Sequence, residues 1–296
     1  MMNAAEHRAG FVTIVGRPNV GKSTLMNRLV GQKLSIISPK PQTTRQSIKG
    51  ILSSENRQIV FLDTPGFLVP RYELQERMLR TIRNAFRGAD VIVFLTEVAS
   101  FPTDYDAAMC EELKRVPTQR LAVLNKIDKA DDVKVQAAAA HLSELGFDDV
   151  LAISALHDEN FDPLLEALTQ RLPFSPPLYD PDDLSDAPVR FFAQEIIREQ
   201  IFLQYQQEIP YSSAVIVESY EDLPNKTVIH ANIWLEHDSQ KPIMLGAGGQ
   251  AIKKLRLAAE KEMYRFLGKR TQLQLWVKVK KNWRKKKGAL TEFGYR

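Results

Sequence analysis

The sequence has one cysteine and no long apolar run. A single thiol, Cys110, cannot build an internal disulfide framework, which favours a reducing compartment. No apolar run approaches the roughly 20 residues of a membrane-spanning helix, and the N-terminal residues lack the apolar segment of a secretory leader. These absences argue against a secreted or integral membrane protein. They predict a cytoplasmic protein and leave peripheral attachment to a membrane open.

The net charge of +4 hides an uneven distribution of charge along the chain. Residues 188–296 hold 19 Lys and Arg against 11 Asp and Glu, a net charge of +8. Residues 1–187 hold 21 against 25, a net charge of −4. Because the two parts differ in sign, we expect the second part to meet a polyanion. A chain of 296 residues, 44% of them hydrophobic, is also long enough for two domains of ordinary size.

A phosphate-binding loop is the most specific pattern in the chain. Gly16 and Gly21, with four residues between them, are followed by Lys22 and Ser23. An apolar run precedes the loop and a helical pattern follows it, which is the context that the motif requires. The loop amides would face a β-phosphate, Lys22 would neutralise charge near the β and γ groups, and Ser23 would bind Mg²⁺. The nucleotide-binding residues predicted in this segment are Gly16, Asn19, Val20, Gly21, Lys22, Ser23 and Thr24.

Two further motifs directly follow apolar strands, and their residue types are suited to binding Mg²⁺ and guanine. Asp63 and Gly66 follow the strand 59–62, where a carboxylate can hold Mg²⁺ through water and a glycine N–H can reach the γ-phosphate. Asp128 follows the strand 121–124, and its carboxylate can accept hydrogen bonds from the N1–H and exocyclic amine of guanine. Adenine lacks this pair of donors, so the site should reject it. The nucleotide-binding residues predicted here are Asp63, Thr64, Pro65, Gly66, Asn125, Lys126 and Asp128.

A third segment, which follows the strand 150–153, offers a backbone N–H to the guanine carbonyl. Each motif therefore stands at the C-terminal end of a strand, where ligands bind in open α/β sheets. The strand 91–95 ends in Thr96 and Glu97 without a motif, and we assign it to the core. The base-contacting residues predicted in the third segment are Ser154, Ala155 and Leu156.

The set and order of these segments resembles translation-factor-type P-loop GTPases. The resemblance implies an α/β domain with a mostly parallel sheet and helices on both faces, which binds GTP or GDP with Mg²⁺ and hydrolyses GTP by attack of water. It also implies a Thr on a flexible loop that closes over Mg²⁺, for which Thr44 is the first choice and Thr43 the alternative. The metal-binding residues are then Ser23, Thr44 and, through water, Asp63, and the catalytic residues are Lys22, Thr44 and Gly66.

Phe67 stands where related GTPases such as Ras carry a water-orienting Gln. Because a phenyl ring cannot hydrogen-bond water, we expect slow intrinsic hydrolysis. The chain is similar to a branch of GTPases with a hydrophobic residue at this position. That similarity implies a potassium ion held in part by the loop residue Asn19.

The second half of the chain follows a region of five prolines whose charges are all acidic, which predicts a stiff linker. After it come a helical pattern at 191–203, strands at 214–218 and 228–235, a Gly-x-x-Gly turn, a helix at 253–267 and a strand at 273–280. This is the order of a type II KH RNA-binding domain, whose Gly-x-x-Gly loop clamps about four nucleotides. The predicted parts are a GTPase domain at 1–172, a linker at 173–188 and an α+β KH domain at 189–296.

The glycines of this second loop let a phosphate chain approach the protein backbone. Its variable positions are Ala247 and Gly248, where the family often carries a Lys. Lys253 and Lys254, one turn later, can supply the missing charge. The RNA-binding residues predicted in this half are Gly246, Ala247, Gly248, Gly249, Lys253, Lys254, Lys280, Lys281 and Arg284.

The segment from Trp276 to Lys287 contains seven basic residues and no acidic one. It predicts a contact with RNA or with lipid headgroups. The alternative is a solvated, charged end to an edge strand. Trp276 and Trp283 could stack on bases, although the strand spacing favours a core position for Trp276.

A GTPase domain followed by a KH domain resembles a bacterial GTPase family that acts in maturation of the small ribosomal subunit. The resemblance implies a monomer that binds 16S ribosomal RNA near its 3′ end, acts in assembly of the 30S subunit, contacts the anionic inner membrane peripherally and is released after hydrolysis. Two other functions stay open. One is a membrane-associated GTPase switch coupled to the cell cycle, in which the basic segment meets anionic lipid. The other is an ATP-driven RNA remodeller, which Asp128 opposes.

Overall fold

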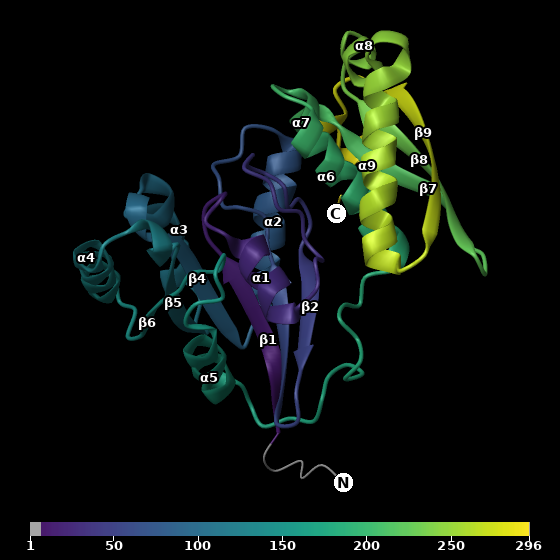
Figure 1. Cartoon of the computed structure of the whole chain (residues 1–296). Helices are drawn as coiled ribbons and strands as arrows, with labels where there is room; N and C mark the ends of the chain where they lie inside the picture. Colours follow the sequence, from purple (N-terminus) through teal and green to yellow (C-terminus); the bar gives the residue numbers. More distant parts are fainter. Residues whose placement is uncertain (1–6, 296) are drawn as a thin grey trace. The chain divides into compact units, whose positions relative to one another are not determined.

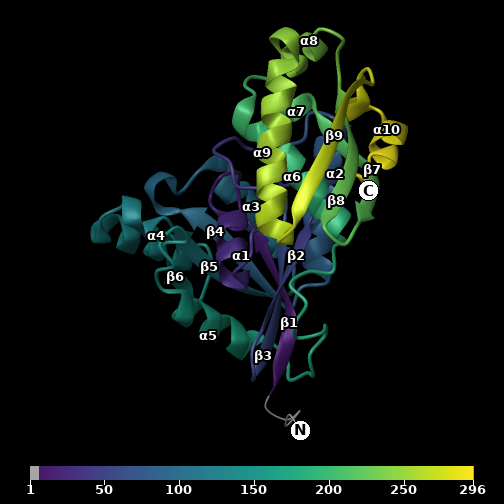
Figure 2. The same cartoon turned by 45° about the vertical axis from the view of Figure 1, so that its right-hand side comes forward.

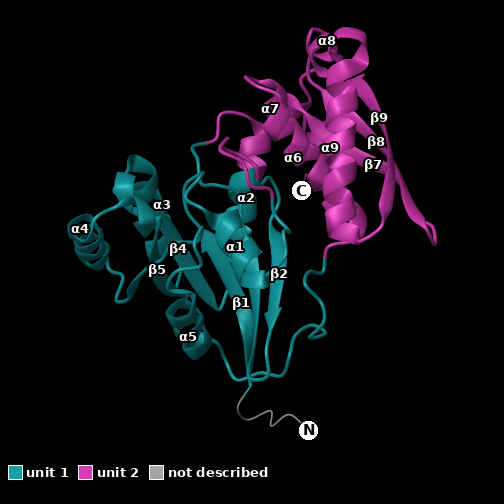
Figure 3. Ribbon diagram, viewed as in Figure 1, with its two compact units in different colours: residues 1–35, 44–69, 78–186 teal, residues 36–43, 70–77, 187–296 magenta. Residues whose placement is uncertain are grey.

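The computed structural model describes residues 7–295, and the chain forms two compact units (Figure 1, Figure 3). Unit 1 contains the residues before 36, then 44–69 and 78–186. Unit 2 contains 36–43, 70–77 and the residues from 187 onward. Two short segments from the GTPase part of the sequence therefore belong to unit 2. None of the helices within residues 7–295 is long and apolar enough to cross a membrane.

Unit 1 is built on a six-stranded sheet in the order β2-β3-β1-β4-β5-β6. Neighbouring strands are parallel except for β2, which pairs antiparallel with β3 at one edge. The central strands are nearly continuous apolar runs, as expected for strands that are covered on both faces. The strands are β1 (Arg8–Val15), β2 (Ile48–Ser53), β3 (Arg57–Asp63), β4 (Val91–Glu97), β5 (Gln119–Asn125) and β6 (Val150–Ala152).

Within residues 7–295, five α-helices accompany this sheet (Figure 1). One hydrophobic cluster joins three of them to β4 and β5, with Phe86, Met109 and Leu142 packed near Phe94 and Leu124. Of the other two, one contacts β2 and β3 and one contacts β1. The predicted α/β fold with a mostly parallel sheet is therefore confirmed. The helices are α1 (Lys22–Val30), α2 (Glu73–Arg87), α3 (Asp104–Lys114), α4 (Asp132–Glu144) and α5 (Phe161–Arg171).

Unit 2 contains a three-stranded sheet in the order β7-β8-β9. β7 and β8 are antiparallel, and β8 and β9 are parallel. One face of the sheet packs on α6 and α9 through a cluster that includes Ile197, Ile233, Leu255 and Leu273. The order of elements confirms the predicted KH fold. The elements are α6 (Val189–Gln204), α7 (Ile209–Ser212), β7 (Ala214–Asp222), β8 (Lys226–Leu235), α8 (Gln240–Leu245), α9 (Gln250–Leu267), β9 (Arg270–Val279) and α10 (Lys287–Glu292).

The sequence patterns give no range for several elements of the structure, among them β2, α8 and α10. β2 is short and polar in part, and a Cβ on its Gly50 would lie 2.8 Å from Val30 Cγ2, so glycine allows close packing by α1. α9 also begins at Gln250, three residues before the predicted start. Short elements with few apolar residues give weak periodic signals, which is why the patterns miss them.

The region 173–186 forms no helix or strand, but it packs along unit 1. The Leu178 N–H donates to Gln58 Oε1 at 2.6 Å. The Ile51 N–H of β2 donates to the Leu184 carbonyl oxygen at 2.9 Å. The extended region thereby covers an edge strand of the sheet, which is a common protection for such edges. These contacts carry unit 1 past the predicted end of the GTPase domain, and that boundary stays a prediction.

Candidate functional site

The loop between β1 and α1 is built on glycines for which larger residues have no room. A Cβ on Gly16 would lie 2.1 Å from the Leu95 carbonyl oxygen, and a Cβ on Gly21 would lie 2.3 Å from Asn125 Nδ2. Gly21 also has a left-handed backbone with φ +105, which L side chains rarely adopt. The loop backbone is therefore closely packed and leads directly into the N-terminus of α1. There, free N–H groups and the helix dipole favour binding of an anion.

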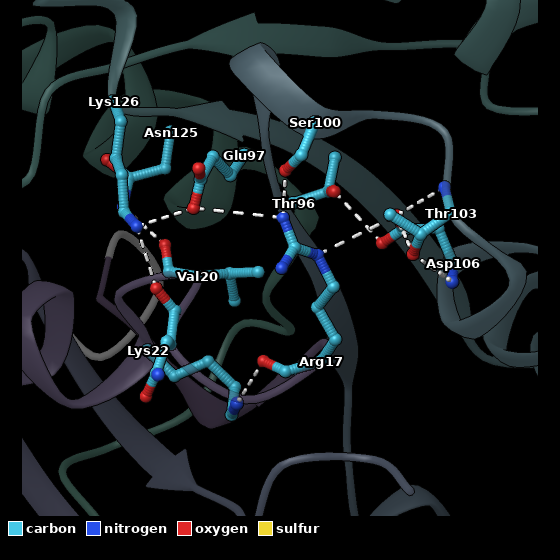
Figure 4. Close-up of polar contacts among 11 residues, drawn as sticks. Arg17, Val20, Lys22, Thr96, Glu97, Ser100, Thr103, Asp106, Asn125 and Lys126 are labelled. Carbon is cyan, nitrogen blue, oxygen red and sulfur yellow. Dashed lines mark hydrogen bonds and ion pairs between the residues drawn. The ribbon is translucent and has the colours of Figure 1, made fainter. Parts of the chain in front are cut away.

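Lys22 begins α1 and turns its amine back toward this loop (Figure 4). Its Nζ donates to the carbonyl oxygens of Gly16 and Arg17 at 3.1 and 3.0 Å. Burial lowers the pKa of Lys22 to about 8; the charge of Asp63 opposes this shift, and that of Arg17 adds to it. A phosphate bound in the loop would stabilise the charged amine and raise this pKa again.

Three side chains converge beside the loop in a cluster of oxygen atoms. Ser23 Oγ and Thr44 Oγ1 donate to Asp63 Oδ2 at 2.7 and 3.1 Å, and the two hydroxyl oxygens are 3.1 Å apart. Asp63 Oδ1 is buried and has no hydrogen-bond partner among residues 7–295. Burial raises the pKa of Asp63, and the charge of Lys22 opposes that shift. An oxygen-only set with an unsatisfied carboxylate fits Mg²⁺. Of the two candidate threonines, Thr44 rather than Thr43 makes these contacts.

Asn125 joins the phosphate loop to the segment at the end of β6. Its Nδ2 donates to the Val20 carbonyl oxygen at 2.7 Å, and its Oδ1 accepts from the Ala155 N–H at 2.9 Å. The Ala155 N–H, one of the donors predicted for the guanine carbonyl, is thus already bonded within the protein. Asp128 Oδ1 accepts from Ser154 Oγ at 2.5 Å, so a hydroxyl orients the carboxylate that is predicted to select guanine. The structure brings these motifs together although they lie far apart in the sequence.

The remaining predicted residues of this site lie around the same edge. Thr64 is buried, and its Oγ1 donates to the Ile14 carbonyl oxygen at 2.7 Å. Leu156 is exposed, and its carbonyl oxygen accepts from Arg28 at 3.1 Å. Thr24 lies in the first turn of α1. Their nucleotide contacts stay predictions.

Gly66 and Phe67, at the end of the magnesium motif, contact the phosphate loop and hold the motif against it. A Cβ on Gly66 would lie 2.9 Å from Pro18 Cα, and the Phe67 N–H donates to the Gly16 carbonyl oxygen at 3.1 Å. The Phe67 ring is buried in the hydrophobic cluster that includes Phe86. Phe67 therefore serves the core, and its ring offers no group that could orient a water molecule.

Glu97, at the end of β4, is a polar member of the site that the sequence reading missed (Figure 4). Lys126 Nζ donates to Glu97 Oε2 at 2.5 Å and to the Asn19 carbonyl oxygen at 2.8 Å. Arg17 lies 3.7 Å from the same carboxylate and 3.9 Å from Asp106. The strand 91–95 lies in the core as expected, whereas Glu97, just beyond it, belongs to the site. The strand order could have indicated Glu97. β4 runs parallel between β1 and β5, so its C-terminal end lies between the two motifs that follow those strands.

The Gly-x-x-Gly loop lies between α8 and α9 with its backbone on the surface. Gly246, Gly248 and Gly249 all have left-handed φ values, +71, +55 and +76. A Cβ on Gly248 or Gly249 would have no atom within 4 Å. Lys253 and Lys254 are exposed in the first turns of α9. The loop thus offers bare backbone with two lysines nearby, as a nucleic-acid phosphate chain requires.

The basic residues after β9 differ from one another in their contacts. Lys280 forms an ion pair with Glu292, and Arg284 Nε donates to the buried carboxylate of Glu236 at 2.7 Å. Lys281 lies 3.1 Å from Asp238, with both side chains largely exposed. RNA contacts by these three residues stay predictions, and RNA would have to compete with partners inside the protein. Lys285, Lys286 and Lys287 are exposed.

The two tryptophans of this segment are placed opposite to expectation. Trp276, for which the strand spacing favours the core, is 45% exposed on the sheet. Trp283 is fully buried, and its Nε1–H donates to the Ser212 carbonyl oxygen at 2.9 Å. Trp283 therefore holds the C-terminal segment to the domain, whereas Trp276 is available at the surface.

Comparison with known proteins covers both units. Residues 11–126 match a family described as 50S ribosome-binding GTPase, and residues 208–284 match the KH domain. The chain is 42% identical over 292 residues to GTPase Era of Caldicellulosiruptor saccharolyticus, with 97% of each chain covered. It is 41% identical over 294 residues to GTPase Era of Lacticaseibacillus paracasei, with 98% of each chain covered.

Two solved structures have the same fold over nearly their whole length. Era in complex with MgGDPNP and nucleotides 1506–1542 of 16S ribosomal RNA is 35% identical, with a TM-score of 0.95 over 98% of this chain and 99% of that chain. A variant of Aquifex aeolicus Era bound to GDP and AlF4⁻ is also 35% identical, with a TM-score of 0.94 over 97% of this chain and 99% of that chain. The nucleotide site and the Gly-x-x-Gly loop both lie within the matched length.

Proposed function

Because the chain belongs to the Era family of GTPases, we propose that its KH domain binds 16S ribosomal RNA near the 3′ end and that its nucleotide state controls this binding during assembly of the 30S subunit. One observation carries the proposal. A relative with this fold was solved in complex with both MgGDPNP and nucleotides 1506–1542 of 16S ribosomal RNA. The present chain forms both loops that such binding needs. We further propose that it works in the cytoplasm as a monomer.

The chain is a GTPase that uses GTP, GDP and Mg²⁺. We assign Lys22 and the loop amides to stabilising negative charge on the phosphates. Ser23 and Thr44 are the residues that would hold Mg²⁺, whose charge neutralises the β and γ phosphates. Water attacks the γ-phosphate while the Gly66 N–H donates a hydrogen bond to an oxygen of that phosphate. With Phe67 in the core, intrinsic hydrolysis is slow, and a potassium ion held in part by Asn19 would assist it.

Unit 2 includes two segments whose neighbours in the sequence belong to the nucleotide site. In the segment 36–43, the Ile37 N–H donates to Glu199 Oε1 of α6 at 3.1 Å. In the segment 70–77, Arg77 donates to Thr291 Oγ1 of α10 at 3.2 Å. The first segment leads directly into Thr44, and the second follows the magnesium motif. Ordering of such segments by a γ-phosphate is a known form of GTPase switch, so these contacts give the nucleotide a route to the KH domain.

A matched pair of glycine variants tests the RNA-binding half of the proposal. Gly249→Asp places a side chain and a negative charge where a phosphate chain should approach, and we expect it to abolish binding of an RNA spanning nucleotides 1506–1542. Gly268→Asp is the control, because Gly268 also has a left-handed φ of +70 with open space around its Cβ, but it lies at the far end of α9. Both variants should bind GTP like the parent.

Fluorescence anisotropy with the labelled RNA and a scrambled RNA measures the effect. Equal binding of the specific RNA by the parent and by Gly249→Asp would overturn the assignment of the Gly-x-x-Gly loop. Loss of binding in both variants would instead point to strain at α9.

The exposed lysines at 285–287 also suit anionic lipid, and we propose that any peripheral membrane contact is made there. Flotation with vesicles of anionic and of neutral lipid, at matched salt and with the specific RNA as competitor, compares the two partners. Binding to anionic vesicles that the RNA cannot displace would favour the rival function, a membrane-associated switch. Displacement by RNA at low excess supports the ribosomal role.

A further inference from the structure

The KH sheet has a second face, opposite the one that α6 and α9 cover. Alternate residues of β8 and β9 point to this face, and the strand register places Asn232 beside Trp276 and Trp234 beside Lys278. The C-terminal segment covers one end of it, where the Phe293 ring lies 5.6 Å from the Trp234 ring. Figure 2 shows α9 and α10 on opposite sides of β9. The part of the face around Trp276 lies beyond this cover.

This uncovered part forms an open pocket of about 570 Å³ on the surface of the sheet. Trp276 is 45% exposed, and its ring meets the His230 ring at 5.4 Å in an edge arrangement. Asn232 Nδ2 donates to Glu218 Oε1. Glu218 stands at a β-bulge between Val217 and Ser219. The residues that line the pocket are Glu218, Ser219, His230, Asn232, Trp276 and Lys278.

Three of these residues, Trp276, Lys278 and Glu218, each match one part of a nucleotide. A half-exposed indole offers a flat surface on which a base can stack, and such stacking is a main source of affinity for single-stranded nucleic acid. Lys278 supplies a cation for the adjoining phosphate. A carboxylate such as Glu218 accepts hydrogen bonds from an exocyclic amine, as in recognition of cytosine N4. The β-bulge, a feature that often re-aims a side chain, presents Glu218 to the pocket.

We propose that this pocket binds an unpaired RNA base that carries an exocyclic amine, as a second RNA contact separate from the Gly-x-x-Gly loop. The inference rests on the proposed function, since it assumes that the KH domain holds RNA. Charge favours RNA over a protein partner, because residues 188–296 carry a net charge of +8. A protein partner would also need a larger contiguous apolar patch than one indole ring.

The test measures binding of two labelled, unstructured 12-nucleotide RNAs, one rich in C and one rich in U, to protein loaded with Mg²⁺ and a non-hydrolysable GTP analogue. Trp276→Ala should weaken binding of the C-rich RNA by about 5- to 150-fold, the range for loss of one stacked base. The parent should bind the C-rich RNA more tightly than the U-rich RNA, since only cytosine has the amine. Trp276→Ala should reduce this ratio of affinities. Trp276→Phe should keep most of the affinity, because the phenyl ring can still stack.

Two further measurements guard against effects on folding. Tyr264→Ala removes another exposed aromatic, 57% exposed against 45% for Trp276, from α9 of the same domain and should leave RNA binding unchanged. In the parent, RNA should quench tryptophan fluorescence, and this quenching should be lost in Trp276→Phe although RNA still binds. Lys278→Gln should flatten the slope of log affinity against log salt by about 0.7, the value for one phosphate contact with single-stranded RNA.

The outcomes separate this inference from the proposed function. If Gly249→Asp abolishes binding while Trp276→Ala binds both RNAs like the parent, the pocket is not an RNA site and the KH assignment stands. If Gly249→Asp has no effect, the proposed function itself fails. Should Trp276→Ala bind naked RNA normally but lose affinity for whole 30S subunits, the occupant is a protein, which also contradicts the inference.

Discussion

Two loops in this chain are rich in glycine, and they need it for different reasons. In the phosphate loop, the protein fills the space that a Cβ would take: a Cβ on Gly16 would lie 2.1 Å from the Leu95 carbonyl oxygen, and a Cβ on Gly21 would lie 2.3 Å from Asn125 Nδ2. In the Gly-x-x-Gly loop, a Cβ on Gly248 or Gly249 would meet nothing within 4 Å. The first set of glycines is needed to fold the site. Of the second set, Gly246 is also packed, since its Cβ would lie 2.6 Å from Ala251 Cβ, whereas Gly248 and Gly249 leave open space for a ligand.

The difference follows from where each loop lies. The phosphate loop is enclosed by the ends of β4 and β5, so its geometry is fixed by neighbours before any nucleotide binds. The Gly-x-x-Gly loop joins two helices at the surface and has its free side toward solvent. Substitutions should therefore damage stability and nucleotide binding in the first loop, but RNA binding in the second.

The largest expected effect is in the phosphate loop. Gly16→Ala would drive a methyl group into the Leu95 carbonyl, and we expect it to lower the free energy of unfolding by about 3 kcal/mol and to abolish GTP binding. Gly31→Ala is the control, since Gly31 has a left-handed φ of +75 with open space around it and should cost only about 1 kcal/mol. Denaturant unfolding and nucleotide titration measure both. Equal stability of the two variants would contradict the packing argument.

The second-largest effect is expected in the recognition of guanine. Asp128→Asn removes the charged acceptor of the guanine donors, so GTP affinity should fall by about 10- to 100-fold, while binding of xanthosine triphosphate should improve. Ser154→Ala, which removes only the hydroxyl that orients Asp128, should have a smaller effect in the same direction. Competition with a fluorescent guanine nucleotide reports both changes. A variant that binds GTP as the parent does would refute the assignment of Asp128.

The pKa of Lys22 predicts that nucleotide binding takes up a proton. With a pKa of about 8 in the free protein, about half of the Lys22 amines are neutral at pH 8, and bound phosphate charges them by raising the pKa. Calorimetry in buffers of different ionisation heat should show uptake of about half a proton at pH 8, more at pH 9 and almost none at pH 6.5. GTP affinity should fall as the pH rises above 8. Absence of uptake at pH 9 would mean that Lys22 stays charged without nucleotide.

The same shift fixes the sign of the effect on stability. The pKa of Lys22 is lower in the folded protein than its ordinary value of 10.5, so between about pH 8 and pH 10.5 the unfolded chain binds more protons than the folded one. Lys22 therefore favours unfolding at neutral pH, and its contribution makes the nucleotide-free protein more stable as the pH rises through this window.

The smallest change concerns the surface lysines of the RNA-binding half. Replacing Lys285, Lys286 and Lys287 by Gln should weaken binding of every RNA sequence alike and flatten the slope of log affinity against log salt by roughly 2 to 3 units. Loop geometry is untouched, so preference for the specific RNA over the scrambled RNA should persist. A slope that does not change would show that these lysines make no phosphate contact.

Much of the nucleotide site could be predicted from the sequence because its motifs are local. Asp63 and Asp128 each stand next to a recognisable strand end, and a parallel sheet brings such ends to one edge. Glu97 could not be found in this way, because its partner Lys126 becomes a neighbour only when β4 lies beside β5.

The two tryptophans show a second limit. Alternation along β9 separates two faces of the strand but does not say which face is buried, so the spacing alone predicts the wrong face for Trp276. Trp283 follows the strand in a segment that reads as charged and solvated, yet it is buried with Phe293. Its burial depends on α10, which has too few residues to show a helical period.

Coupling between nucleotide and RNA is the central claim, and one comparison of affinities tests it. The RNA spanning nucleotides 1506–1542 is titrated into protein loaded with Mg²⁺ and a non-hydrolysable GTP analogue, and into protein loaded with GDP. We expect at least about tenfold tighter binding in the GTP-like state, with the RNA strengthening binding of the GTP analogue over GDP by the same factor, as linkage requires. Equal RNA affinity in the two states would contradict the account.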